Sequence, residues 1–456
     1  MASAGHIAAL HVAERLRTAG YEAYFAGGCV RDLLLGVEAK DFDVATSATP
    51  DKVLALFPKT FAVGAHFGVI LVCEDVEGRE IVTEVATFRS DGVYLDGRHP
   101  EEVRFSKSPR EDVLRRDFTI NGMMLDPILQ RETCSLTSAV LDYVGGQNDL
   151  REGIVRAIGD PRRRFEEDKL RMLRAVRFAA RLGYAIEPET ERAIRELAPG
   201  IAQVSRERVR DELTRMLTEG QAARAFDLLD RVGLLQQVLP EVSRMHGVEQ
   251  PPEFHPEGDV WVHTLLLLEK LPPGASPTLA WGALLHDVGK PATFSHNPPD
   301  RIRFNGHVEV GVKIAHEILR RLRFSNEDCA QILSLVENHM RFGDVEKMKE
   351  STLKRFFRLP HFDEHLALHR MDCLSSHGDL SLYDFAKRKR EEMPEEEVRP
   401  ALLVTGRDLI AAGYKPGPAF KEMLRLAEDA QLEGRIHSRE EGLQLIREQE
   451  SENRLR

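Results

Sequence analysis

Residues 27–43 read GGCVRDLLLGVEAKDFD, and this stretch decides the fold of the N-terminal part of the chain. A glycine pair between a strand and a helix lets backbone N–H groups approach phosphate oxygens closely, and the helix N-terminus adds a favourable dipole. Asp41 and Asp43 stand two residues apart, so on one strand both carboxylates face the same side, while Phe42 points to the other. A bare pair of this kind is usually a turn or a solvated edge. Behind the glycine pair, converging carboxylates instead favour a Mg²⁺ site.

Length, composition and charge set the wider frame. At 456 residues the chain exceeds one ordinary domain, which predicts roughly two to four compact units. The 42% of hydrophobic and 30% of charged residues are typical of a soluble globular protein. The net charge of −11 argues against binding nucleic acid over the whole surface, so any RNA site must be local. Residues 151–181 carry ten basic against five acidic side chains, which indicates either a phosphate-facing strip or an exposed helix face.

The cysteines and the apolar runs indicate a compartment. The five cysteines are scattered, with no Cys-x-x-Cys pair, which favours a reducing environment over a disulfide framework. No basic stretch followed by an apolar core opens the chain, and no run of about 18 apolar residues occurs in it. We therefore expect a cytoplasmic protein with no membrane partner.

The pattern along the chain changes from mixed to helical. Up to about residue 145, β-branched runs such as Val69–Cys73 and Ile81–Phe88 alternate with short helical segments. After that point, long amphipathic helices are predicted at Glu166–Leu182, Pro188–Leu197, Arg206–Leu217 and Ala222–Val232. The expected fold class is therefore α+β, with an α/β head followed by all-helical parts.

Proline clusters and a charged run predict the domain boundaries. Prolines gather at residues 251–256 and again at 272–277, which favours a boundary near residue 250. The charged run at residues 387–397 is interpreted as a solvated linker. The expected domains are a head at 1–145, a helical neck and body at 146–250, a third domain at 251–395 and a helical tail at 396–456.

The first motif resembles that of a known family. Residues 27–46 are similar to the opening motif of the nucleotidyltransferases related to DNA polymerase β, specifically the class II, bacterial-type tRNA nucleotidyltransferase and poly(A) polymerase family. The resemblance implies that Asp41 and Asp43 are catalytic and hold Mg²⁺, which activates the primer's 3′-hydroxyl and neutralises the leaving pyrophosphate. It also implies which residues cradle the triphosphate, namely Gly27, Gly28 and Arg31.

Two further positions extend the resemblance within the head. The superfamily often uses a third carboxylate on a neighbouring strand, for which Glu84 is the candidate, and a strand-surface glutamate is the alternative. RRDFTIN at residues 115–121 resembles the family's ribose-contacting motif, where Asp117 and Asn121 can each bond hydroxyl groups. A helix N-cap by Asp117 is the other interpretation. By the same resemblance, residues 89–111 form a flexible loop that helps to switch nucleotide choice.

A basic helix carries the candidate base reader. Asp168 and Arg171 share one helix face at spacing i, i+3, so an intrahelical ion pair is one interpretation. The segment from Glu167 to Arg171 also resembles the family's base-reading motif. In that motif a carboxylate accepts from the exocyclic amine of cytosine or adenine, and a guanidinium donates to a ring acceptor. Uracil and guanine present a carbonyl instead, so the resemblance implies selection of CTP and ATP by side chains.

The following helices continue the family pattern. Arg174 and Arg177 are nucleotide-binding candidates by resemblance, and ERVRDEL at residues 207–213 is similar to the last core motif. Within it, Arg208 and Glu212 are interpreted as an i, i+4 ion pair that buttresses the neck. One departure is Gly122, where the family pattern predicts alanine.

The C-terminal half carries a candidate metal centre. His286 and Asp287 follow an apolar helix, Leu279–Leu285. Adjacent His and Asp at a helix end, with histidines on other helices, is how a helical domain assembles a mixed N/O metal site. The pattern resembles the HD phosphohydrolase superfamily, and the resemblance implies these ligands of a divalent transition metal: His263, His286, Asp287 and Asp372. His307 and His339 would complete a second metal site or orient phosphate.

These resemblances imply template-independent addition of CCA to the 3′ end of tRNA from CTP and ATP, with a possible accessory phosphohydrolase activity. Enzymes that add only A or only CC share every motif, as do poly(A) polymerases, although residues 63–68 lack the basic residues associated with the latter. An HD metal phosphohydrolase with an RNA-binding N-terminal half is an alternative of another class, against which Asp41 and Asp43 argue. A domain of this kind can also be retained for binding or oligomerisation, and the metal's identity and the oligomeric state stay open.

Overall fold

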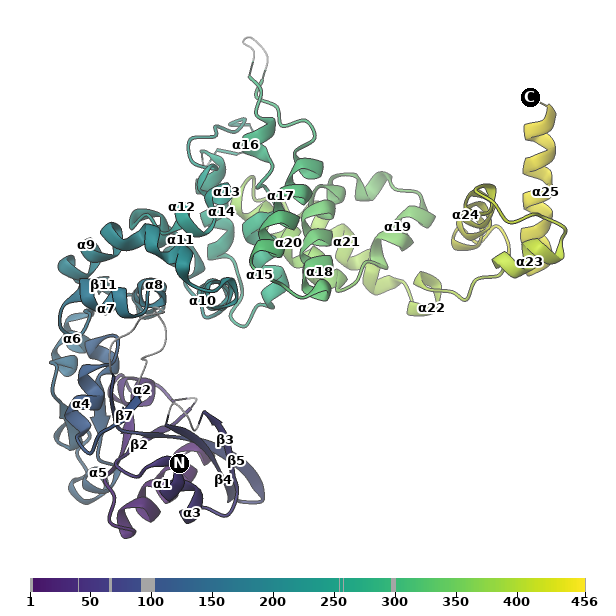
Figure 1. Cartoon of the computed structure of the whole chain (residues 1–456). Coiled ribbons are helices and arrows are strands. Elements are labelled where there is room, and N and C mark those ends of the chain that lie inside the picture. Colours follow the sequence, from purple (N-terminus) through teal and green to yellow (C-terminus); the bar gives the residue numbers. More distant parts are fainter. Residues whose placement is uncertain are drawn as a thin grey trace. The chain divides into compact units, whose positions relative to one another are not determined.

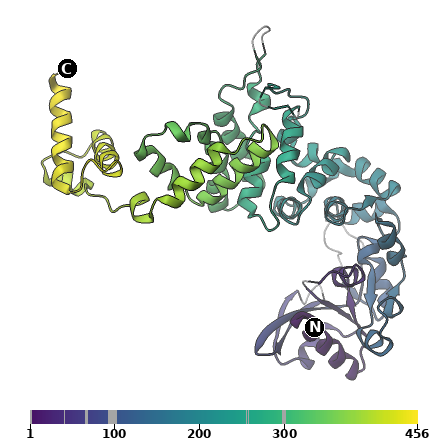
Figure 2. The ribbon, with the colours of Figure 1, turned by 180° about the vertical axis from the view of Figure 1, so that it is seen from behind.

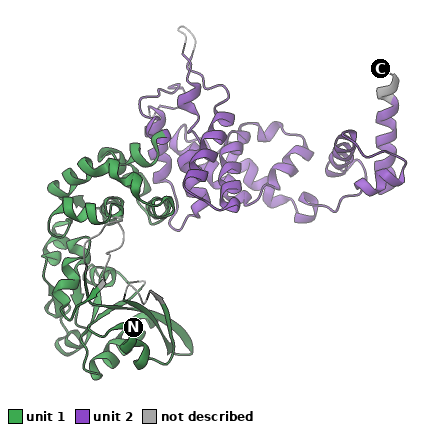
Figure 3. Cartoon of the chain, viewed as in Figure 1, with its two compact units in different colours: residues 1–240 green, residues 241–456 purple. Residues whose placement is uncertain are grey.

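The computed structural model describes residues 3–39, 41–64, 68–91, 103–253, 255–256, 258–296 and 301–455. The chain forms two compact units, Met1–Pro240 and Glu241–Arg456, which Figure 3 shows in different colours. The predicted α+β class is confirmed, because one mixed sheet lies in the first unit and long helices follow it (Figure 1). None of the helices in the described ranges is long and apolar enough to cross a membrane.

A seven-stranded sheet forms the head, in the order β3-β4-β5-β2-β1-β8-β9. Its strands are β1 (Ala23–Ala26), β2 (Asp43–Thr46), β3 (Thr60–Gly64), β4 (Val69–Val76), β5 (Arg79–Thr87), β8 (Met123–Leu125) and β9 (Val140–Asp142). Only β2 and β5 pair in parallel, and the other neighbours are antiparallel. Helix α1 (Ala4–Thr18) packs on one face, where Val44, Ile70 and Val85 are fully buried. The opposite face carries Asp43 and Glu84, which are paired in register.

The predicted strands of the head are confirmed, with small shifts at their ends. The other head elements are α2 (Gly28–Leu34), α3 (Pro50–Leu56), β6 (Arg89–Asp91), β7 (Val103–Phe105), α4 (Pro109–Leu114) and α5 (Pro127–Thr133). The stretch 89–111 was expected as one loop, but β6 pairs with β7 and α4 begins within it. Residues 92–102 of that stretch, and 65–67 of the stretch 63–68, lie outside the described residues.

Helices make up the remainder of the first unit. They are α6 (Gly146–Glu152), α7 (Pro161–Glu167), α8 (Leu170–Leu182), α9 (Pro188–Leu197), α10 (Arg206–Thr218), α11 (Ala222–Arg231) and α12 (Leu235–Val238), with short strands β10 (Ile154–Val155) and β11 (Ala185–Ile186) between them. The single helix predicted over Glu166–Leu182 is wrong. Asp168 is extended, with φ of −147°, and its carboxylate accepts from the backbone N–H of Leu170 at 3.1 Å, which ends α7 and starts α8.

The absence of a side chain at Gly122 has a packing reason. A Cβ there would lie 2.8 Å from Cδ1 of Ile158 and 3.0 Å from Cγ2 of Val144. Contacts this short force neighbours to shift. The chain therefore keeps glycine where the family pattern predicts alanine.

The second unit is helical throughout its described residues. Its helices are α13 (Pro240–Ser243), α14 (Val260–Glu269), α15 (Pro277–Leu285), α16 (Lys290–Thr293), α17 (His307–Arg321), α18 (Asn326–Asn338), the 3-10 helix η5 (His339–Lys347), α19 (Glu350–Phe357), α20 (Phe362–Ser375), α21 (Ser381–Glu392), α22 (Glu395–Val398), α23 (Gly406–Ala411), α24 (Ala419–Leu432) and α25 (Arg439–Leu455). Helices α14, α15, α18 and α20 pack together within this unit. Figure 2 shows the helices of the chain from behind.

The charged run at residues 387–397 is not a linker. Its basic part ends α21 and its acidic part begins α22. Val398 at the end of α22 is fully buried in a cluster with Phe357 and Ala386. The exposed charges therefore belong to helices whose apolar sides complete a core.

Candidate functional site

Two carboxylates face each other on the open side of the head sheet. Asp43 is the first residue of β2 and pairs in register with Glu84 of β5, so their side chains share a face. Burial, and then the charge of Glu84, raise the pKa of Asp43 to about 6. Burial also raises the pKa of Glu84. The structure thus places Glu84, the candidate third carboxylate, directly opposite Asp43.

Asp41 lies outside the strand, contrary to the sequence prediction. It precedes β2, belongs to no helix or strand and is exposed. Its negative charge contributes to the raised pKa of Asp43. A partly buried set of like charges is stabilised by a divalent cation, and carboxylate oxygens are the ligands that Mg²⁺ prefers. The residues present therefore fit Mg²⁺.

The glycine turn precedes α2, as predicted. Gly27 has φ of 77°, a left-handed conformation that glycine adopts without strain, and its N–H donates to the carbonyl oxygen of Met123. Arg31 is buried, and its Nη1 donates to Oδ1 of Asn121 at 2.7 Å. Its Nη2 donates to Oδ1 of Asp32, also at 2.7 Å. Arg31 therefore connects α2 to the 115–121 motif as well as lying beside the glycine turn.

Arg116 is a candidate that the sequence interpretation did not single out. Its Nη2 donates to Oδ2 of Asp112 at 2.9 Å, and a Cβ at Gly27 would lie 3.2 Å from its Nη1. Burial opposes the charge, but Asp112, Asp117 and Asp43 hold the pKa of Arg116 above its ordinary value. This guanidinium lies beside the glycine turn, and a guanidinium is a group that binds phosphate oxygens. The signal in the sequence was the acidic residue four positions earlier, at i, i+4 spacing.

Asp117 and Asn121 belong to a polar network. Oδ2 of Asp117 accepts from Nη2 of Arg174 at 2.6 Å, and Oδ1 accepts from Nδ2 of Asn121 at 3.4 Å. The alternative role of Asp117 as a helix N-cap is wrong, because Phe118 is the residue at the N-cap of the short 3-10 helix Thr119–Asn121. Arg174 comes from α8, so the network joins the head to the first long helix of the neck.

The network continues along α8 to α10. Nε of Arg177 donates to Oε2 of Glu212 at 2.7 Å, and Arg174 lies 4.0 Å from the same carboxylate. The ring of Phe178 lies beneath three guanidinium groups, those of Arg31, Arg174 and Arg177, at 5.3, 5.3 and 4.4 Å. All three cations therefore gather around one aromatic ring.

The two ion pairs that helical spacing allows, Asp168 with Arg171 and Arg208 with Glu212, are not the pairs that the structure shows. Asp168 is not on the helix face of Arg171, and its carboxylate accepts from Nη2 of Arg208 at 2.7 Å. Arg171 instead donates to Oε2 of Glu167 at 2.9 Å. Arg208 is thus engaged by Asp168 rather than by Glu212. Spacings of i, i+3 and i, i+4 on a helix would allow both of those pairs. The helix is broken at Asp168, however, and its carboxylate contacts α10 instead.

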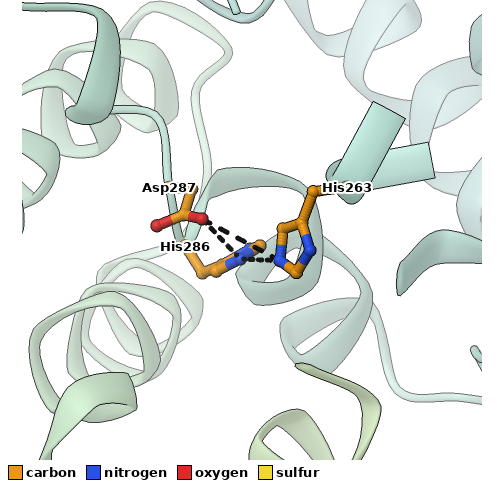
Figure 4. A group of neighbouring side chains, drawn as sticks. All are labelled: His263, His286 and Asp287. Carbon is orange, nitrogen blue, oxygen red and sulfur yellow. Dashed lines mark hydrogen bonds and ion pairs between the residues drawn. The ribbon is translucent and has the colours of Figure 1, made fainter. Parts of the chain in front are cut away.

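The six predicted ligands of the C-terminal centre come together from five segments. His263 comes from α14, His286 and Asp287 follow α15, and Asp372 comes from α20. Figure 4 shows His263, His286 and Asp287 pointing toward one another. Nε2 of His286 lies 3.2 Å from Oδ2 of Asp287, and Nε2 of His263 lies 3.1 Å from Oδ1 of Asp372.

A second group shares Asp287. Nε2 of His307, at the start of α17, lies 3.8 Å from its Oδ1, and Nε2 of His339 lies 3.7 Å from the same atom. The two histidine nitrogens are 3.4 Å apart. Asp287 therefore presents Oδ2 to one histidine pair and Oδ1 to the other, an arrangement with room for two cations.

The protonation states fit metal binding. Nδ1 of His286, His307 and His339 each donates to the carbonyl oxygen three residues earlier, at 2.7 to 3.0 Å, which leaves Nε2 free to bind a metal. Burial lowers the pKa of His339 to about 4, so this imidazole is neutral near pH 7. Burial alone would raise the pKa of Asp287, but Lys290 and His286 hold it well below its ordinary value. Neutral imidazoles and ionised carboxylates are the forms that bind metals.

Lys290 and a cavity complete this centre. Nζ of Lys290 lies 2.7 Å from Oδ2 of Asp287 and donates to Oε1 of Gln250 at 2.6 Å, a contact that the sequence interpretation missed. The cavity is about 700 Å³, a size typical of small-molecule sites. Its lining is rich in cations and histidines: Pro251, His255, Asp287, Lys290, Arg301, Ile302, Arg303, Phe304, Asn305, His307, His339, Met340, Asp372, Ser376 and His377.

Comparison with known families divides the chain in the same order. Residues 23–156 match the family described as "Poly A polymerase head domain". Residues 183–245 match that described as "Probable RNA and SrmB- binding site of polymerase A", and residues 259–399 match the HD domain. The carboxylates of the head and the histidine cluster therefore lie within matched regions, whereas the base reader, Arg174 and Arg177 lie between two of them.

Comparison with individual proteins gives the same picture. A CCA-adding enzyme of Bacillus pumilus is 30% identical over 443 residues, which cover 96% of this chain and 95% of that protein. One of Geobacillus stearothermophilus is 45% identical over 226 residues, and here the chain spans about half of the relative's length, 53%.

Solved structures of the same kind share the fold. The crystal structure of the Bacillus stearothermophilus CCA-adding enzyme in complex with CTP covers 98% of both chains, with a TM-score of 0.73 and 28% identity. A Thermotoga maritima CCA-adding enzyme complexed with tRNA, at 18% identity and a TM-score of 0.54, covers 96% of this chain and 94% of that one. The latter likeness concerns the fold alone.

Proposed function

The chain belongs to the family of CCA-adding enzymes, and on that premise we propose that it adds C and A nucleotides to the 3′ end of tRNA. The donors are CTP and ATP, no nucleic-acid template takes part, and the reaction takes place in the cytoplasm. The observation that carries this proposal is the in-register pair of Asp43 and Glu84 beside the glycine turn at Gly27. A head that merely bound RNA would not need like charges held together on a sheet.

The reaction assigns a role to each part of the head. Asp41, Asp43 and Glu84 would hold Mg²⁺, which when bound makes the 3′-hydroxyl a better nucleophile and neutralises pyrophosphate. Backbone N–H groups at the glycine turn and the guanidinium of Arg116 bind the triphosphate oxygens. Asn121, held by Arg31, and Asp117, held by Arg174, offer polar atoms to the ribose hydroxyls.

Base choice is assigned to Asp168 and Arg171. The carboxylate of Asp168 accepts from the amine of cytosine or adenine, and Arg208 fixes its orientation. The guanidinium of Arg171 donates to a ring acceptor while Glu167 holds it in place. Arg208 thus orients Asp168, and Glu167 orients Arg171. Two side chains held in fixed positions support the selection of a base without a template.

Three tRNA transcripts test the addition. They end at the discriminator base, at C and at CC, and each is incubated with labelled CTP or ATP. Growth to the full CCA end supports the proposal, whereas addition of A alone to the CC transcript indicates a partial enzyme and long A tracts indicate a poly(A) polymerase.

Matched variants test the carboxylates. Asp43→Ala and Glu84→Gln should each lower addition at least a hundredfold. Glu80→Gln serves as the control, because Glu80 lies on the same face of β5, four residues from Glu84, and pairs with Lys59. Full activity of the Asp43→Ala protein would remove the basis of the proposal.

For the C-terminal centre we propose a metal-dependent phosphohydrolase. The ligand set His263, His286, Asp287 and Asp372 would hold a divalent transition metal, with His307 and His339 completing a second position around Asp287. A bound metal supplies hydroxide near neutral pH. Lys290 and the cationic cavity lining suit a phosphate ester, and cyclic phosphate on a damaged RNA end would fit a repair role.

Metal content and hydrolysis test this centre together. The purified protein is analysed for bound metals and assayed with 2′,3′-cyclic and terminal phosphates. His307→Ala should lose hydrolysis, while His316→Ala, an exposed histidine on the same helix, should not. If the protein binds metal but hydrolyses neither substrate, the C-terminal centre is a metal-binding site and not a phosphohydrolase.

A further inference from the structure

Among the described residues, the outer half of the head sheet has one face packed on α1 and one open face, on which side chains are exposed. Toward α1, Ile70 and Val85 are fully buried. On the opposite face, Phe61 of β3 is 50% exposed and Val82 of β5 is 52% exposed. Figure 1 shows β3, β4 and β5 together at this outer edge of the sheet. Aromatic side chains on an exposed sheet face are groups on which the bases of single-stranded nucleic acid stack, and Phe61 is such a side chain.

The strand register places Phe61 in line with the catalytic carboxylates. Asp43 pairs with Glu84, Glu84 pairs with Leu71 and Leu71 pairs with Phe61. Residues paired in register share a face of the sheet, so all four side chains point to the same side. Neighbouring strands lie about 4.8 Å apart, which puts Phe61 about 14 Å from Asp43.

That distance matches the end of an RNA strand. Stacked nucleotides advance by about 3.4 Å each, so about four cover the span, and extended ones cover it in fewer. Stacking on an aromatic ring accepts any base. This suits a primer whose last bases change with every addition.

We propose that Phe61 stacks on a base of the RNA primer, within about four nucleotides of the reacting 3′ end, and holds that single-stranded end on the open sheet face. The inference rests on the proposed nucleotide addition. Phe61 is thereby an RNA-positioning residue that acts on primer binding and not on the chemical step.

Kinetics of ring removal test the proposal first. Phe61→Ala should raise KM for the tRNA primer about tenfold, while KM for CTP and kcat stay within twofold, because only base stacking is lost. Phe61→Tyr should restore the primer KM, and Phe61→Leu, which keeps apolar volume without a ring, should not. Leu129→Ala is the control, since Leu129 is an exposed apolar residue on α5. If Phe61→Ala destabilises the sheet, Phe61→Leu serves as the folded variant that lacks the ring.

Primers with one missing base test the contact directly. An abasic nucleotide is placed in turn at each of the last four positions. With the wild type, the abasic nucleotide at one of these positions should raise the primer KM about as much as Phe61→Ala does. In the Phe61→Ala protein, the abasic nucleotide at that position should not raise the primer KM further. Independent effects at every position, or an unchanged primer KM in Phe61→Ala and Phe61→Leu, would overturn the stacking.

The same measurements distinguish a failure of the proposed CCA addition from a failure of the proposed stacking on Phe61. A wild type that extends no RNA contradicts the proposed function itself. A wild type that completes CCA while both ring-less variants behave like it contradicts only the role of Phe61. A change in oligomeric state of Phe61→Ala with unchanged primer kinetics would assign the open face to a second copy of the chain and would also overturn the proposal.

Discussion

At the scale of single residues, the raised pKa of Asp43 makes a prediction about stability. In the metal-free protein its folded pKa is about 6 against 3.8 for the free group, because of burial and Glu84. The folded state therefore binds the proton more tightly, so the ionised carboxylate costs stability above about pH 6, and that cost fades as pH falls toward 4. Asp43→Asn should raise the free energy of unfolding by about 1–2 kcal/mol at pH 7.5.

Urea unfolding in EDTA at pH 7.5, 6 and 4 measures this effect. The gain from Asp43→Asn should shrink across that range and vanish near pH 4. Glu38→Gln, at an exposed position between α2 and β2, should change stability little at any pH. A gain that is equal at all three pH values would refute the electrostatic explanation.

Arg208 allows a second prediction at this scale. It donates to both oxygens of Asp168, at 2.7 and 3.3 Å, and so fixes the plane of the proposed base-reading carboxylate. Arg208→Ala should lower the preference for CTP over UTP about tenfold, with a smaller loss in total addition. Competition between labelled CTP and UTP measures the ratio. Arg215 is an exposed arginine on the same helix, so Arg215→Ala should keep the preference for CTP over UTP. An unchanged preference in Arg208→Ala would show that Asp168 does not select the base.

Some of these residue roles could be predicted from sequence and others could not. The Asp41 and Asp43 pair and the His286 and Asp287 pair are local motifs whose spacing is visible in the chain. Ion-pair partners are not local. Arg208 had Glu212 one turn away, yet it contacts Asp168, forty residues earlier, because the fold brings α10 beside the helix break.

At the scale of elements, periodicity predicted three of the four amphipathic helices expected between residues 166 and 232. The expected Pro188–Leu197 is found unchanged as α9, and α10 and α11 differ by one residue at one end. The break at Asp168 was missed because the residues around it are good helix formers. The hydrogen bond from the N–H of Leu170 to the carboxylate of Asp168 competes with the continuous helix, and periodicity carries no signal for such a bond.

Gly289 packs closely against the backbone of helix α17. A Cβ there would lie 2.1 Å from the carbonyl oxygen of His307 and 2.6 Å from the backbone nitrogen of Gly311. Both atoms are backbone, so α17 itself would have to move and carry His307 away from Asp287. Gly289→Ala should therefore lower stability by about 1–3 kcal/mol and weaken metal binding at the C-terminal centre.

Thermal unfolding and metal analysis of Gly289→Ala check this expectation. Gly343→Ala in η5 is the matched control, because its Cβ would meet no heavy atom within 4 Å. Normal stability together with a full complement of metal in Gly289→Ala would show that α17 tolerates the displacement.

At the scale of the whole molecule, each candidate site draws its residues from one compact unit. The network from Arg31 to Glu212 lies within Met1–Pro240, and the histidine cluster lies within Glu241–Arg456. Chain length predicted several domains, and hydrophobic periodicity predicted the change from mixed to helical structure. The meeting of these candidate ligands from segments far apart in sequence could be anticipated only through the family resemblance.

Two sites built in separate units should be separable by mutation. His286→Ala should abolish metal binding at its centre and phosphate hydrolysis, because it removes a ligand whose Nε2 lies 3.2 Å from Asp287. It should leave CCA addition within about twofold of wild type. Asp43→Ala should do the reverse, since its carboxylate faces Glu84 and has no part in the histidine cluster. Both reactions are measured on the same preparations, with circular dichroism to verify folding. A folded His286→Ala protein with more than tenfold weaker CCA addition would show that the C-terminal centre acts on the polymerising head.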